Sequence, residues 1–185
     1  MKASENLTND LQSVLFSKEE LQTKVKEIGL KLTKDYQGKR PVLLCILKGS
    51  VLFFSDLIRE INLPLEIEFM AVSSYGSGSV SSGEVKIVKD LDKSIHGKDV
   101  ILVEDIVDSG MTLNFLKRTL QNRGVSSLRI VTLLDKPSRR IAPLTIDYVG
   151  FEIPDEFVVG YGLDYDESYR NLDHIGILSR HMYES

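Results

Sequence analysis

The chain has 185 residues and a formal net charge of −4, and its 42% hydrophobic and 27% charged residues are ordinary for a globular protein. A chain of this length can bury roughly 70% of its unfolded surface, so we expect one domain that needs no disulfide or structural metal. The acidic balance gives no general reason to expect nucleic-acid binding, so any anion site has to be local. The single cysteine, Cys45, lies in the apolar run VLLCIL, which excludes a disulfide framework and predicts a packing role in a reducing compartment. No signal peptide is evident and no apolar run approaches the roughly 20 residues of a membrane span, so we expect a cytoplasmic protein.

The first regular element is predicted after a polar, irregular segment at residues 1–15. Ser17 and Glu20 stand at the spacing of a capping box, which marks the start of a helix over residues 16–32. Apolar residues then recur at four-three-four spacing and form one stripe (Leu21, Val25, Ile28 and Leu32). We interpret this segment as a packing helix with a charged, solvated outer face.

The middle of the chain alternates between strand and helix patterns. These are a buried strand (41–47), a helix (51–61), an alternating strand (65–72), a Ser/Gly-rich stretch (73–83) and a further strand (84–88). A strand (98–106), a helix (111–124) with Gly124 at its carboxyl end, and a strand (127–136) follow. Two short β-type runs (147–153 and 156–164) and a less regular tail (169–179) complete the chain. Apolar strands that alternate with helices predict a mostly parallel sheet covered on both faces.

Unusual polar residues stand at the carboxyl ends of three of these strands. They are Lys48 and Gly49 after the strand at 41–47, residues 104–112 at the end of the strand at 98–106, and Lys136 at the end of the strand at 127–136. Ligands of open parallel sheets bind beyond the carboxyl ends of the strands. The sequence therefore predicts one binding edge to which three strands contribute.

The segment VILVEDIVDSGMTL (100–113) carries the strongest signal at that edge. Its loop leads into a helix amino terminus, where unpaired N–H groups, the hydroxyls of Ser109 and Thr112, and the small Gly110 form a phosphate cradle. A tight strand–helix turn alone explains that loop but leaves Glu104 and Asp105 without a purpose. Two close carboxylates suit donating hydroxyls or a hard cation such as magnesium, so the expected ligand resembles a ribose 5-phosphate.

This segment resembles the phosphoribosyl-pyrophosphate motif of type I phosphoribosyltransferases. LKGS (47–50) resembles the pyrophosphate loop of that family, and SSYGSG (73–78) the start of its mobile lid. LLDKPSRR (133–140) and VGFEIPDEFVVGYGLDYDESYRNL (149–172) resemble the hypoxanthine and hypoxanthine–guanine branch, and the similarity runs from about residue 12 to 181. The resemblance implies a single domain over 1–185, with a central mostly parallel sheet flanked by helices. It also implies a lid at about 73–84 and a small hood formed by about 1–20 and 150–185.

The resemblance also implies roles for residues that would hold phosphoribosyl pyrophosphate. Glu104 and Asp105 would bind the ribose hydroxyls directly or through magnesium, and Asp164 would bind a second magnesium ion. The 5′-phosphate would be held by Ser109, Gly110, Met111 and Thr112. Pyrophosphate would be contacted by Lys48, Gly49 and Arg170, with Ser74 and Tyr75 in the lid. In the family the peptide that matches Leu47–Lys48 can be cis.

The purine would be bound by a second group of residues. Asp108 would act as general base towards its imidazole ring, and Lys136 would reach O6. Phe157 would stack on the base and Val158 would offer backbone groups, although taken alone Phe157 is more typical of a core position. The Ser/Gly-rich stretch, with six Ser and three Gly in eleven residues, has lid composition but also suits a plain hairpin loop.

The implied function is purine salvage: transfer of a phosphoribosyl group to hypoxanthine, with guanine as a further substrate, giving IMP or GMP and pyrophosphate. A xanthine-preferring enzyme is an alternative within the family. A phosphoribosyl-pyrophosphate-sensing regulator that binds nucleic acid is a less favoured one, because the chain is acidic, Asp108 is present and only 40 residues precede the first predicted sheet strand. The resemblance further implies a homodimer or homotetramer.

Overall fold

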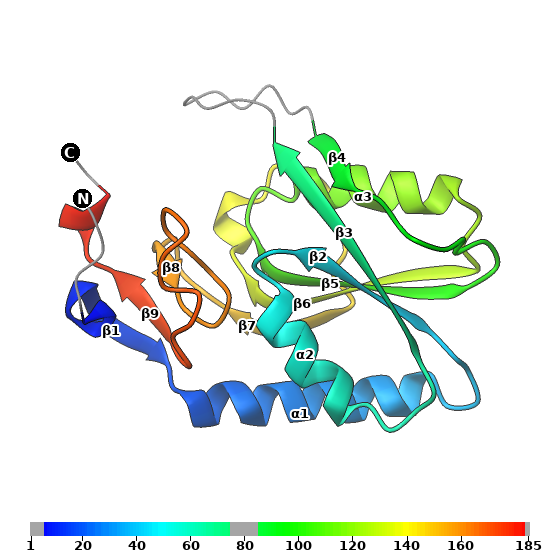
Figure 1. Cartoon of the computed structure of the whole chain (residues 1–185), viewed down its shortest axis with the longest axis horizontal. Coiled ribbons are helices and arrows are strands. Elements are labelled where there is room, and N and C mark those ends of the chain that lie inside the picture. The colour runs from blue at the N-terminus through cyan, green and yellow to red at the C-terminus, as the bar shows by residue number, and fades with distance from the viewer. Residues whose placement is uncertain (1–5, 75–84, 184–185) are drawn as a thin grey trace.

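The computed structural model describes residues 6–74 and 85–183, and its centre is a six-stranded sheet (Figure 1). The strand order is β4-β3-β2-β5-β6-β7. The bounds are β2 Val42–Leu47, β3 Glu66–Ser74, β4 Val85–Lys89, β5 Asp99–Val107, β6 Ser127–Asp135 and β7 Tyr148–Glu152. The pair β3–β4 is antiparallel, whereas β2–β3, β2–β5, β5–β6 and β6–β7 are parallel. The predicted mostly parallel sheet is confirmed.

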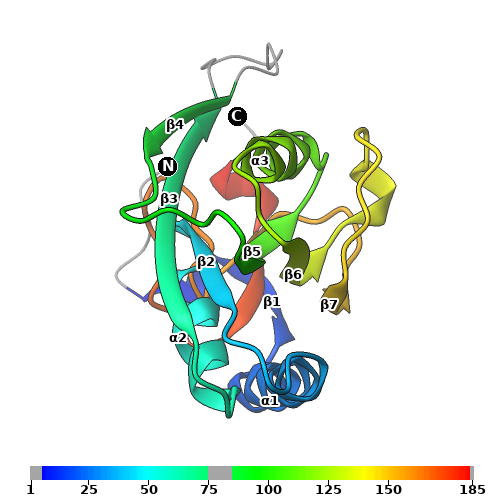
Figure 2. The same ribbon diagram turned by 90° about the vertical axis from the view of Figure 1, so that its right-hand side faces the viewer.

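Helices cover both faces of this sheet, as Figure 2 shows. Helices α1 (Lys18–Asp35) and α2 (Val51–Glu60) lie on one face, and α3 (Met111–Asn122) lies on the other. Two apolar cores result, because successive side chains of a strand point to opposite faces. Leu43 and Cys45 pack in the core under α1 and α2, whereas Leu44 packs in the core under α3. The packing role predicted for Cys45 is confirmed, since its thiol is free and buried.

Helix α1 begins as its sequence predicts. The Ser17 hydroxyl accepts a hydrogen bond from the backbone N–H of Glu20, and the Glu20 carboxylate accepts one from the N–H of Ser17 at 2.8 Å. The predicted stripe is buried along its whole length (Leu21, Val25, Ile28 and Leu32). Capping and burial therefore agree on the same start and the same inner face.

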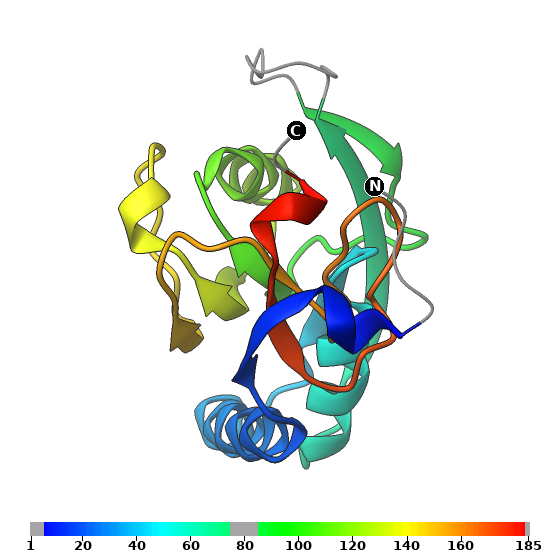
Figure 3. The same ribbon diagram turned by 90° about the vertical axis from the view of Figure 1, so that its left-hand side faces the viewer.

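Segments near the two ends of the chain pair in a small antiparallel sheet (Figure 3). Its order is β1-β9-β8, with β1 at Leu11–Phe16, β9 at Ile175–Leu178 and β8 at Val158–Val159. The prediction of an irregular segment at residues 1–15 is wrong for residues 7–15, because a 3₁₀ turn at Leu7–Asp10 leads into β1, whereas residues 1–5 lie outside the described residues. The tail is also more regular than predicted, because β9 pairs with β1. This sheet built from terminal segments completes the predicted fold class.

The small sheet lies off the carboxyl edge of the central sheet, where β2, β5 and β6 end (Figure 1). The three strands are adjacent and parallel, so residues 48–50, 104–112 and 136 share one edge, as predicted. Within residues 6–74 and 85–183, no helix combines the length and apolar character needed to cross a bilayer.

Candidate active site

The turn between β2 and α2 forms the floor of the site. The peptide Leu47–Lys48 is cis, and Ser50, which is fully buried, follows Gly49. The Ser50 hydroxyl accepts a hydrogen bond from the backbone N–H of Asp105 at 3.1 Å. This bond ties the turn to the acidic end of β5.

Gly49 and Gly162 stand where three segments of the chain approach closely. A side-chain carbon on Gly49 would overlap the carboxylate of Asp105, and one on Gly162 would overlap the backbone oxygen of Gly49. Any larger residue at position 49 would have to displace the Asp105 carboxylate. The structure therefore brings the predicted pyrophosphate turn, the acidic strand end and the loop after β8 into direct contact.

Glu104 and Asp105 are partly buried carboxylates at the end of β5. Burial raises the pKa of Glu104 well above its ordinary value, and the neighbouring Asp105 charge acts in the same direction. Burial raises the pKa of Asp105 to about 6, while its backbone hydrogen bonds, including one from Ile106, and the charge of Arg170 act against the rise. Glu104 Oε2 is buried without a hydrogen-bond partner among the described residues. Such an oxygen is costly to leave unpaired and suits a ligand hydroxyl or a cation.

The loop after β8 carries Asp164 and Arg170, which form an ion pair at 2.7 Å. Arg170 also donates to the backbone oxygen of Gly162 at 2.7 Å. Glu167 lies 2.9 Å from the ammonium of Lys48 and 3.5 Å from the guanidinium of Arg170. The two cations predicted for pyrophosphate therefore flank one carboxylate.

The predicted phosphate cradle lies at the amino end of α3. Gly110 caps this helix with a left-handed φ of 77°, a conformation that favours glycine, and the backbone N–H of Met111 donates to the Ser109 hydroxyl at 3.4 Å. A cavity of about 140 Å³ opens here, and its walls include Glu104, Asp108, Ser109, Gly110 and Thr112. Larger cavities of about 290 and 310 Å³ lie along α1 and α2, but none of the predicted site residues lines them.

Asp108 and Lys136 lie close together at the ends of β5 and β6. The Lys136 side chain is buried and donates to the backbone oxygen of Glu156 at 2.6 Å. Burial lowers the pKa of its ammonium, against the raising effect of the Asp108 charge. The Asp108 Oδ1 atom lies 2.9 Å from the Arg139 Nε, although this approach does not have hydrogen-bond geometry. A half-exposed carboxylate thus stands beside two cations.

Phe157 and Val158 follow the backbone oxygen that Lys136 contacts. Phe157 stacks on Tyr183 with ring centroids 4.9 Å apart and meets Tyr165 edge-on at 5.6 Å. Val158 is buried in β8. Phe157 therefore already has aromatic partners.

The predicted lid falls largely outside the described residues. Ser74 is the last residue of β3, but nothing of its side chain is described, and Tyr75 lies in the undescribed range 75–84. In the described part of the chain, no three His, Cys, Asp or Glu side chains gather as a ready metal site. Glu104, Asp105 and Asp164 are thus not a closed set of metal ligands.

Several residues at this edge were not singled out from the sequence. Ser50 supports Asp105, Arg139 neutralises Asp108, and Glu167 joins Lys48 to Arg170. Arg140 supports the backbone of the predicted phosphate cradle. Its Nε donates to the Asp108 carbonyl at 3.1 Å, and its guanidinium pairs with Asp135. Both arginines stand in the LLDKPSRR motif, so this motif could have indicated them as site residues.

Comparison with known proteins identifies the family. The pattern of the phosphoribosyl transferase domain matches residues 14–166. The chain belongs to this family. The hypoxanthine-guanine phosphoribosyltransferase of Bacillus subtilis is 55% identical over 179 residues, which are 97% of this chain and 99% of that protein. The enzyme of the same name from Streptococcus thermophilus is 52% identical over 177 residues, 96% and 98% of the two chains.

A solved phosphoribosyltransferase also shares the fold. A crystal structure of a hypoxanthine phosphoribosyltransferase from Staphylococcus aureus superposes with a TM-score of 0.94 at 55% identity, over 98% of this chain and 100% of that one. The resemblance to the hypoxanthine and hypoxanthine–guanine branch is therefore confirmed.

Proposed function

We propose that this phosphoribosyltransferase joins hypoxanthine, and also guanine, to phosphoribosyl pyrophosphate in purine salvage. Relatives that are 52–55% identical over nearly the whole chain carry this activity in their names. One observation carries the proposal. At one edge of the sheet lie the predicted phosphate cradle, two carboxylates whose pKa values are raised, and the turn at Gly49. That arrangement suits a sugar with a phosphate at one end and a pyrophosphate at the other.

In the proposed reaction an imidazole nitrogen of the purine bonds to the anomeric carbon of the ribose. The bond from that carbon to pyrophosphate breaks, and the imidazole proton passes to Asp108. Positive charge develops on the sugar, and the carboxylates of Glu104 and Asp105 favour that charge while they hold the ribose hydroxyls. The cradle of Ser109, Gly110, Met111 and Thr112 would keep the 5′-phosphate fixed during displacement.

Lys136 would select the purine through its O6. An ammonium has three donors and no acceptor, so it pairs with a carbonyl oxygen but not with the 6-amino group of adenine. Its present hydrogen bond to Glu156 keeps the ammonium at the start of the segment that carries Phe157. Phe157 would stack on the base, and Val158 would offer its backbone groups.

We propose magnesium as the cofactor, bound through Glu104, Asp105 and Asp164 together with oxygens of the substrate. Magnesium sites commonly use one or two carboxylates plus substrate phosphates, which agrees with the open arrangement of these side chains. The unpartnered, buried Glu104 Oε2 is the observation that fits such a ligand. When bound, the ion would offset the charge of the leaving pyrophosphate. Lys48, Gly49 and Arg170 would contact the same group.

We also propose a cytoplasmic homodimer or homotetramer without nucleic-acid or membrane partners. The net charge of −4 and the single buried cysteine support the location and the partners, and the subunit number follows from the family resemblance.

The test is turnover of hypoxanthine, guanine, xanthine and adenine with phosphoribosyl pyrophosphate and magnesium. We expect activity with hypoxanthine and guanine and none with adenine. Preferential use of xanthine would correct the substrate, and no turnover of any purine would overturn the proposed function.

A further inference from the structure

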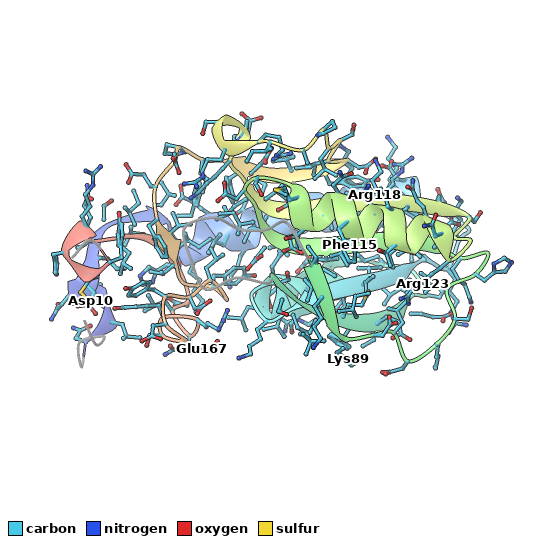
Figure 4. All side chains as sticks on the ribbon, turned by 90° about the horizontal axis from the view of Figure 1, so that it is seen from above. Asp10, Lys89, Phe115, Arg118, Arg123 and Glu167 are labelled. Atoms are coloured by element: carbon cyan, nitrogen blue, oxygen red, sulfur yellow. The ribbon has the colours of Figure 1, made fainter. Side chains whose placement is uncertain are left out.

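The amino-terminal segment reaches the loop that carries Arg170. Asp10 ends the first 3₁₀ turn and is only 6% exposed. Its carboxylate accepts a hydrogen bond from the Tyr169 hydroxyl at 2.8 Å, and its carbonyl accepts one from the N–H of Ser179 at 2.9 Å. Figure 3 shows the amino-terminal segment beside this loop, and Asp10 and Glu167 are labelled in the same region of Figure 4. This hydrogen bond therefore joins Asp10 to Tyr169, which lies 159 positions later in the chain.

The loop has an unusual backbone. Four residues other than glycine have a left-handed φ: Tyr161 at 50°, Asp166 at 50°, Glu167 at 59° and Tyr169 at 76°. Such conformations persist only where the surrounding structure determines them strongly, and they concentrate at functional sites. The loop is thus held in a shape that its own residues disfavour.

Tyr169 is the buried anchor of this loop. Its side chain is 1% exposed and packs with Val159 and Leu178 from the small sheet and with Met182 from the 3₁₀ turn Arg180–Met182. A buried tyrosine hydroxyl needs a partner, and here the described partner is the Asp10 carboxylate. The next residue is Arg170, whose guanidinium contacts Asp164 and Gly162 at 2.7 Å.

We propose that Asp10 is a positioning residue for pyrophosphate: through the Tyr169 hydroxyl it fixes the backbone from which Arg170 meets the leaving group. This inference rests on the proposed function, because it assumes that Arg170 contacts pyrophosphate. It assigns the amino-terminal segment a role in substrate binding in addition to its pairing with β9.

The test compares Tyr169→Phe, Asp10→Ala and Asp10→Asn with the wild type. The first two remove the bond, whereas the amide oxygen of asparagine still accepts from the Tyr169 hydroxyl. Loss of a hydrogen bond to a charged group changes an equilibrium by roughly ten- to a hundredfold, and part of that effect should reach Arg170. We expect Tyr169→Phe and Asp10→Ala to raise the KM for phosphoribosyl pyrophosphate and the inhibition constant of inorganic pyrophosphate about tenfold, with the KM for hypoxanthine within about twofold. Asp10→Asn should stay near the wild type.

Tyr148→Phe is the matched control. Tyr148 is also a buried tyrosine, and it is the first residue of β7 in the central sheet. Its hydroxyl donates to the Asp35 carboxylate at 2.7 Å. Its variant should lose thermal stability while both KM values stay unchanged.

Three outcomes would overturn the inference: equal changes in both KM values, a similar change in Tyr148→Phe, or a lower melting temperature with unchanged constants. Failure of both Tyr169→Phe and Asp10→Ala to fold would also overturn it, because the bond would then serve folding. Failure of the proposed function is separate, since the wild type would then show no turnover at all.

Discussion

Replacing Asp105 by asparagine should make the ligand-free protein more stable above neutral pH. Burial raises the pKa of this carboxyl group from an ordinary 3.8 to about 6 in the folded state. The contribution of the raised pKa to stability is fully present below the unfolded pKa and is lost as the pH rises through about 6. Above that pH the folded protein carries the cost of a charged, crowded Asp105.

The magnitude follows from the size of the shift. About two pKa units correspond to roughly 3 kcal/mol of unfolding free energy, which is an upper value because the side chain is only partly buried. An asparagine stays neutral, and its amide oxygen can still accept the hydrogen bond from Ile106. For a chain of this size we expect the variant to melt roughly 4–10 °C above the wild type at pH 8, and about level with it at pH 4.

The assay is thermal unfolding by circular dichroism between pH 4 and pH 8.5 without ligand. Asp99→Asn is a control of opposite sign, because a hydrogen bond from Ser127 holds the pKa of Asp99 below its ordinary value. That variant should be less stable than the wild type at pH 8, and the difference should shrink only in acid. An Asp105→Asn variant that melts no higher than the wild type at pH 8, or by the same margin at every pH, would refute the reasoning.

The remaining predictions concern catalysis and are read from steady-state kinetics and binding. Asp108→Asn should lower kcat by roughly 10²–10⁴ while affinity for phosphoribosyl pyrophosphate persists, and an unchanged kcat would remove Asp108 as the base. Lys136→Ala should raise the KM for hypoxanthine strongly, because the purine O6 would lose its hydrogen-bond donor, and a KM within about twofold of the wild type would exclude the O6 contact. Amides at both Glu104 and Asp105 should weaken phosphoribosyl pyrophosphate binding more with magnesium present than without it; equal losses would show that these carboxylates do not act through the metal.

Local patterns in the sequence were sufficient for the central sheet and its helices. The capping box at Ser17 and the apolar strand 42–47 depend on neighbours in the chain, so both were predictable. Strand β9 was missed because its partner β1 lies at the other end of the chain, and pairing of distant segments leaves little local signal. The same holds for the left-handed Tyr169, whose conformation is supported by contacts with the small sheet.

The candidate site was predictable where strands end and unpredictable where loops meet. Parallel strands deliver residues 48, 104–108 and 136 to one edge by geometry alone. The contact of Arg139 with Asp108 depends instead on the short 3₁₀ turn Pro137–Arg139. The spacing of apolar residues in the sequence does not predict this turn. The two kinds of information are complementary: strands set the place of the chemistry, and loops set its charge partners.

Those partners bear on how an acidic chain can take a highly anionic substrate. Each cation predicted to meet pyrophosphate lies against a carboxylate: Lys48 at 2.9 Å from Glu167, and Arg170 at 2.7 Å from Asp164. The Lys48 pair is well exposed and so worth little, whereas the Arg170 pair is more buried. An entering pyrophosphate would therefore displace Glu167 at small cost, but would compete with Asp164 unless a cation accompanied it. A magnesium ion beside Asp164 would allow the carboxylate and the pyrophosphate to share one site, because the ion can bind oxygens of both. The ion pair of Arg170 with Asp164 is therefore a reason to expect the proposed metal.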